Sequence, residues 1–125
     1  MGLLDALMGN ASTADPAKLQ ADMAPLLAPG ETVSRGYKLV RDLFVFTDHR
    51  LILVNKQGLT GSKVEYRSIP YRSIVQFSVE NAGSFDRESE LRLWLSGQPA
   101  PLEFTFGKQV DVREVQAVLA AAIAR

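Results

Sequence analysis

Between residues 31 and 106, apolar side chains recur at every second position in short runs that turn-forming residues separate. This alternation is typical of β-strands that are buried on one face. Seven such runs cover residues 33–39, 43–47, 50–54, 63–69, 73–80, 91–95 and 102–106. Asp48 and His49 form a two-residue turn between the second and third runs, which indicates a hairpin. The pattern predicts a mainly β chain.

Residues 1–30 have helical spacing instead. Two helical pieces are expected, one with the apolar residues Leu3, Leu4, Leu7 and Met8 and a second with Leu19, Met23, Leu26 and Leu27. Asp15 and Pro16 form a start signal for the second piece, an N-cap residue followed by proline at the first helical position. Pro25 is expected to weaken or kink this helix because it lacks an amide donor.

A third helix is predicted over residues 111–124. Asp111 and Glu114 have the spacing of a capping box. One continuous apolar face follows, made of Val112, Val115, Val118, Leu119, Ala122 and Ile123. A helix of this kind can close the open end of a bent sheet.

These elements predict a single domain over residues 1–125, with a helical extension (1–30), seven strands (31–106) and a terminal helix (111–124). The fold class is a strongly bent antiparallel sheet or partly open barrel capped by the helix. The expected core contains Tyr37 or Leu39, Leu51 or Ile52, Val75, Phe77, Leu93, Phe104, Val115, Val118, Leu119 and Ile123.

Composition argues against several functions. The chain has no Cys, which excludes disulfides, thiolate zinc sites and thiol nucleophiles, and its single His, His49, is expected to be exposed in a turn. Its 14 basic and 14 acidic residues balance, so a nucleic-acid binder is not expected. No nucleophile–base pair is apparent. We therefore expect no catalysis, no metal and no cofactor. Without a signal peptide or an apolar run of membrane-spanning length, the cytoplasm is the expected compartment.

Four stretches, residues 2–12, 37–54, 61–70 and 77–83, resemble the bacterial pleckstrin-homology-like domain family. The likeness covers nearly the whole chain. It implies the pleckstrin-homology fold and a bacterial cytosolic protein of undefined biochemical role. It also implies ring-forming homo-oligomers, and it brings no catalytic residues.

Surplus apolar surface suggests an interface. The hairpin of residues 43–54 is apolar on both faces, so either Phe44 and Phe46 or Leu43 and Val45 must point away from the barrel interior. The N-terminal helices or a neighbouring subunit could cover that face. Trp94 is expected outside the barrel with Arg92. The candidate interface residues are Trp94, Arg92, Phe44, Phe46, Leu3, Leu4 and Leu7.

Basic residues in the first half of the chain provide a weaker hypothesis, contact with an anion or lipid headgroup. The candidates are Lys38, Arg41, Arg50 and Lys63. Eukaryotic lipid-binding members of the superfold hold inositol phosphates with a long basic loop between the first two strands. Here Arg41 and Asp42 form a short connection, and the Asp42 carboxylate repels phosphate.

Two functions are therefore expected as alternatives. The first is a non-catalytic module that assembles into a homo-oligomeric ring, with a pentamer among the possible sizes, and acts as a scaffold for an unknown protein partner. The second is a peripheral binder of anionic lipids or headgroups, and membrane contact is the less favoured of the two.

Overall fold

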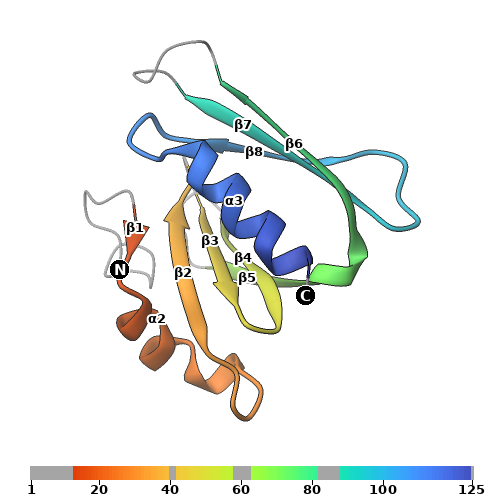
Figure 1. The fold of residues 1–125 in the computed structure, drawn as a ribbon. Coiled ribbons are helices and arrows are strands. Elements are labelled where there is room, and N and C mark those ends of the chain that lie inside the picture. Colours follow the sequence, from red (N-terminus) through yellow and green to blue (C-terminus); the bar gives the residue numbers. More distant parts are fainter. Residues whose placement is uncertain (1–12, 40–41, 58–62, 82–87, 125) are drawn as a thin grey trace.

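Two antiparallel sheets and one long helix make up most of the structure, a computed structural model that describes residues 13–39, 42–57, 63–81 and 88–124 (Figure 1). The elements in chain order are β1 (Thr13–Ala14), α2 (Pro16–Asp22), the 3₁₀ turn η1 (Ala24–Leu26), β2 (Val33–Lys38), β3 (Leu43–Thr47), β4 (Arg50–Gln57), β5 (Lys63–Pro70), the 3₁₀ turn η2 (Tyr71–Ser73), β6 (Ile74–Asn81), β7 (Ser89–Leu95), β8 (Leu102–Phe106) and α3 (Val112–Ile123).

The strands form a large sheet with the order β1-β2-β3-β4-β5 and a small sheet with the order β6-β7-β8. A single bridge between Leu39 and Phe106 joins the sheets at one corner, and η2 leads from β5 into β6. Helix α3 lies in the angle between the two sheets (Figure 1). The predicted fold class is confirmed, and the two-residue strand β1 is added to the seven expected strands.

The two faces of the β3–β4 hairpin are both covered within this chain. Phe44 and Phe46 point into the main core and are 0% and 1% exposed. Leu43 and Val45 pack in a second cluster with Leu19 of α2. Phe44 and Phe46 are therefore absent from the surface, contrary to their prediction as interface residues, because the second face of the hairpin is covered by the protein's own N-terminal segment.

A close approach of α2 to β2 makes this cover possible. A Cβ at residue 36 would lie 2.5 Å from Cδ1 of Leu19 and 3.3 Å from Cβ of Ala14, so any larger residue would force the leucine side chain to move. The Asp15 side chain accepts a hydrogen bond from the Ala17 amide and caps the helix as predicted. The helix ends at Asp22, before Pro25, which lies in η1. The candidate residues Leu3, Leu4 and Leu7 lie outside the described residues.

One predicted core residue, Val75, lies on the surface with 64% exposure. The ladder between β6 and β7 shifts its register between Ile74 and Gln76. An extra residue at such a bulge reverses the alternation of side chains. Ile74 is therefore buried, whereas Val75 and Gln76 are both exposed. Beyond the bulge Phe77 packs against the core as predicted.

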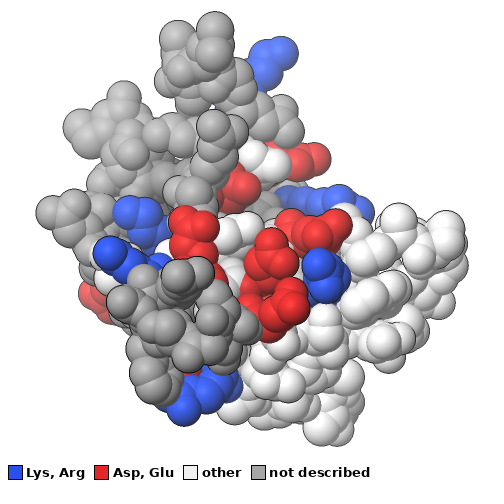
Figure 2. Space-filling view, turned by 90° about the horizontal axis from the view of Figure 1, so that it is seen from above, with Lys and Arg blue, Asp and Glu red and all other residues white. Residues whose placement is uncertain are grey.

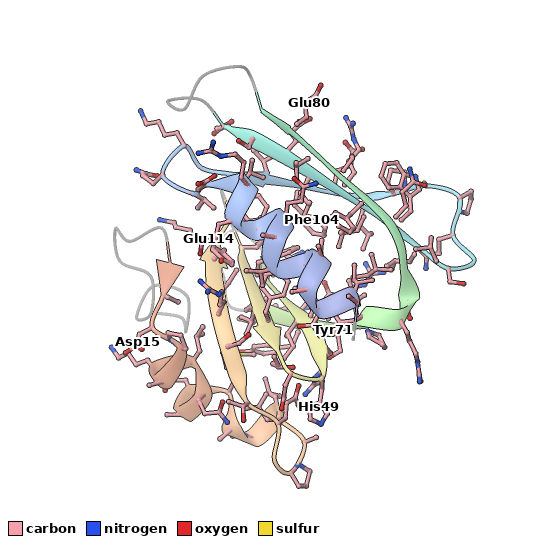
Figure 3. The ribbon with its side chains drawn as sticks, in the orientation of Figure 1. Asp15, His49, Tyr71, Glu80, Phe104 and Glu114 are labelled. Atoms are coloured by element: carbon pink, nitrogen blue, oxygen red, sulfur yellow. The ribbon has the colours of Figure 1, made fainter. Side chains whose placement is uncertain are left out.

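Helix α3 docks through apolar contacts and through polar contacts that Glu114 makes with Tyr37 and Arg35 of β2. Val115 and Leu119 are completely buried in the main core. The Asp111 side chain caps the helix by accepting from the Arg113 amide at 3.0 Å. The Glu114 carboxylate, predicted to complete a capping box, instead faces β2 (Figure 3) and accepts from the Tyr37 hydroxyl at 2.6 Å. Burial, with help from this carboxylate, raises the pKa of Tyr37 above its usual range.

We expect Leu119→Ala to lower the free energy of unfolding by about 2–5 kcal/mol, because the substitution leaves a cavity under α3. Urea denaturation measures this loss. Gln116→Ala on the same helix is the control and should change stability by less than about 0.5 kcal/mol. Equal, small effects of both substitutions would show that α3 is not docked on the sheets.

Candidate functional site

Arg50, predicted to contact anions, is partly buried and bound to groups of the protein itself. Its Nε and Nη2 atoms donate to the two carboxylate oxygens of Glu31, each at 2.9 Å. Its Nη2 also donates to the Leu26 carbonyl and its Nη1 to the Ser68 hydroxyl, both at 2.7 Å. A guanidinium with these partners stabilises the fold, and its role in anion contact stays a prediction.

The Glu31 carboxylate at the centre of this network is fully buried. It accepts further hydrogen bonds from the Thr47 hydroxyl at 2.6 Å and from the Ala28 amide at 2.9 Å. The bonds from Arg50, aided by those from Thr47 and Ala28, lower the pKa of Glu31 from 4.5 to about 2 despite its burial. The carboxylate therefore stays ionised at all physiological pH values.

The lowered pKa of Glu31 predicts a pH dependence of stability. A carboxyl group with a folded pKa of about 2 and an unfolded pKa of 4.5 contributes stability above pH 4.5 that is lost as pH falls through 2. We expect Glu31→Gln to cost about 3 kcal/mol at pH 7 in urea unfolding, and clearly less at pH 2.5. The exposed Glu88→Gln is the control and should unfold like the parent protein. An equal cost at both pH values would contradict this role for Glu31.

The remaining basic candidates do not gather. Lys38 ends β2 and Lys63 begins β5, so β3 and β4 lie between them. With strands about 4.8 Å apart, this separation is about 14 Å across the sheet alone. Arg41 lies outside the described residues. The cationic cluster that anion binding needs is therefore not assembled from Lys38, Arg50 and Lys63.

The outer face of the small sheet, turned away from α3, holds the other predicted pair. Trp94 and Arg92 are both partly buried there, and Glu80 points away from the molecule (Figure 3). The Arg92 guanidinium lies 3.6 Å from the Glu90 carboxylate and 3.4 Å from that of Glu103. Seen from above the small sheet, acidic side chains gather near the centre, beside an area without charged side chains (Figure 2).

An exposed apolar residue, Val75, lies next in the chain to the strand partner of Trp94. Trp94 pairs with Gln76, the residue next to Val75 in the bulge. The bulge therefore brings the exposed side chain of Val75 to the same end of the face as the indole. An exposed valine beside an aromatic ring and an arginine has the composition of an interface core. Trp94, Arg92 and Val75 form the candidate interface, which we call the outer patch.

A second feature is a pocket of about 110 Å³ between the sheets, which we call the cleft. Its apolar lining comes from Leu39, Leu53, Val54, Leu102 and Phe104, and its polar lining from Asp42, Asn55, Glu65, Arg67 and Glu103. It is much smaller than the ~300–1,000 Å³ of sites for drug-sized ligands, so it suits one side chain or a small group. Across the described ranges, no three His, Cys, Asp or Glu side chains are placed to hold a metal ion.

The cleft has a signal in the sequence. Glu65 and Arg67 share the face of β5 on which Ile69 is buried, since strand side chains alternate. Charged residues at two successive inward positions indicate that the barrel is open there. The pattern of residues 63–69 predicts a strand. The charged residues at its inward positions also indicate an opening beside that strand, which the prediction from the sequence did not include.

Comparison with known proteins identifies relatives over nearly the whole chain. The bacterial PH domain family matches residues 2–123. The uncharacterized protein YjqA of Bacillus subtilis is 54% identical over 122 residues, which cover 97% of this chain and 98% of that protein. YozO of the same organism, also uncharacterized, is 37% identical and covers 84% of this chain and 86% of its own length.

Solved structures agree with this assignment. A pleckstrin homology domain from Shewanella amazonensis superposes with a TM-score of 0.81 at 53% identity, and 98% of each chain is covered. The hSac2 domain of the human phosphoinositide phosphatase Sac2 has a TM-score of 0.56 at 15% identity, covering 84% of this chain and 76% of that one. The second likeness shows the fold alone.

Proposed function

Because the chain belongs to the bacterial PH domain family, we propose that it acts as a non-catalytic assembly module, which associates with copies of itself and presents a surface to a protein partner. The outer patch is the observation that carries this proposal. Val75 is 64% exposed at the same end of the outer face as Trp94. Aromatic and arginine side chains are enriched among the residues that dominate binding energy at interfaces.

The proposed assembly is a closed ring. In this ring, the outer patch of one copy contacts a different surface of the next copy. Such a contact between unlike surfaces is called head to tail. Head-to-tail contacts either close into a ring or extend into a filament. A ring has a defined mass, so light scattering measures both the association and the number of copies.

We expect Trp94→Glu to lower the mass measured by light scattering, because the substitution brings an unpaired carboxylate into the contact and removes the aromatic ring. Tyr66→Glu is the matched control. Tyr66 is an aromatic residue on the large sheet with 38% exposure, and its replacement should leave the mass unchanged. A parent protein that scatters as one chain would refute the assembly, and an unchanged mass of Trp94→Glu alone would remove the outer patch as its contact.

The described basic residues give no support to the alternative, a binder of anionic lipid. Arg50 is held by Glu31, and Lys38 and Lys63 lie apart on the large sheet. Of the helices in the described part of the chain, none combines the length and the apolar character that a membrane span requires.

We therefore expect the protein to stay in the supernatant when vesicles of phosphatidylserine and phosphatidylcholine are sedimented at low salt. Neutral vesicles of phosphatidylcholine alone are the control. Co-sedimentation with the anionic vesicles that high salt reverses would instead favour the lipid-binding alternative.

A further inference from the structure

We propose that the cleft binds an extended segment of a partner protein and takes up one lysine or arginine side chain. This site is separate from the outer patch, so the inference goes beyond self-association and does not depend on it. Three properties of the cleft lead to this ligand, namely its apolar walls, the sign of its charges and its position between two end strands.

The walls match the stem of a long basic side chain. Leu53 and Phe104 contribute apolar surface from the two sheets, and Leu39 from the corner where the sheets join. Lysine and arginine bury their methylene stems on apolar surface while the charged head stays with polar partners. A volume of about 110 Å³ accommodates one such side chain and no drug-sized molecule.

The charges around the cleft select a cation. Asp42 and Glu65 contribute two carboxylates to the lining and Arg67 contributes one guanidinium, whereas the Glu103 carboxylate lies 3.4 Å from Arg92 on the outer face. The lining therefore carries a formal charge of −1 (two acidic minus one basic). Such a site repels phosphates and attracts ammonium or guanidinium groups. The carboxylates are not gathered into a metal-binding group among the described residues, which favours an organic cation that spans them.

The position of the cleft favours a protein segment over a free cation. Its lining includes residues of β5 and β8, and these are end strands of the two sheets. The main chain of an end strand can pair with an added extended segment, a common mode of peptide recognition in which pockets for alternate side chains give specificity. A segment that pairs with either edge places one side chain at the cleft.

A labelled peptide tests the proposal. The probe is fluorescein-labelled Thr-Val-Lys-Val-Thr, whose β-branched residues favour the extended state. Matched probes carry glutamine or glutamate in place of the lysine. We expect a saturable rise in fluorescence anisotropy with the lysine peptide, weaker binding of the glutamine peptide and none of the glutamate peptide. No binding of the lysine peptide up to the solubility limit of the protein, or equal binding of all three, overturns the proposal.

Two variants locate the binding. Glu65→Gln removes one carboxylate from the cleft and should weaken the lysine peptide about threefold or more. Glu90→Gln removes another exposed carboxylate, on the outer face, and should leave the affinity unchanged. Equal loss in both variants would mean general attraction to acidic surface and would overturn the assignment to the cleft.

Two further measurements distinguish this proposal from an anion-binding cleft and from self-association through the outer patch. Inositol hexakisphosphate should not displace the lysine peptide, and displacement that Glu65→Gln strengthens would identify the cleft as an anion site instead. Peptide binding by Trp94→Glu should equal that of the parent protein. Failure of self-association and failure of peptide binding are therefore measured separately.

Discussion

The buried carboxylate of Glu31 joins the segment beyond η1 to the β3–β4 hairpin, a link that no described strand pairing provides. It binds Arg50 at the start of β4 and Thr47 at the end of β3, and it accepts from the Ala28 amide beyond η1. The Gln20 side chain extends the network to α2 by bridging the Glu31 carbonyl and the Val33 amide. A buried charge is tolerated only when it is paired and fully hydrogen-bonded. These bonds therefore fix where the N-terminal segment lies.

The position of this N-terminal segment determines which apolar surface remains exposed. With α2 held against β2 and β3, Leu43 and Val45 are covered inside the chain, and the hairpin provides no surface for a neighbour. The same segment covers only part of the molecule. The outer face of the small sheet has no helix of its own in the described part of the chain, since α3 lies on the opposite side (Figure 1). The candidate interface is therefore the outer patch and not the hairpin.

The sequence predicts what depends on local pattern and misses what depends on distant partners. Period-two alternation and the two apolar runs around the Asp48–His49 turn located seven strands, and the capping residues Asp15 and Asp111 located two helices. Val75 was misplaced because a bulge leaves no trace in alternation alone. Arg50 was assigned to anions because its partner lies 19 positions earlier in the chain and outside any strand. The exposure of Val75 at the Trp94 end of the small sheet depends on the same bulge and is equally hidden in the sequence.

The opening between the sheets shows how one fold can serve ligands of opposite charge. The fold itself provides the gap, because the two sheets join at Leu39 and Phe106 and separate beyond them. The side chains around the gap decide what enters it. In this chain Asp42 and Glu65 line the gap together with Arg67, so the carboxylates outnumber the guanidinium by one. A chain with the same backbone and lysines at these positions would attract phosphate instead, and for this reason the fold alone does not assign the ligand.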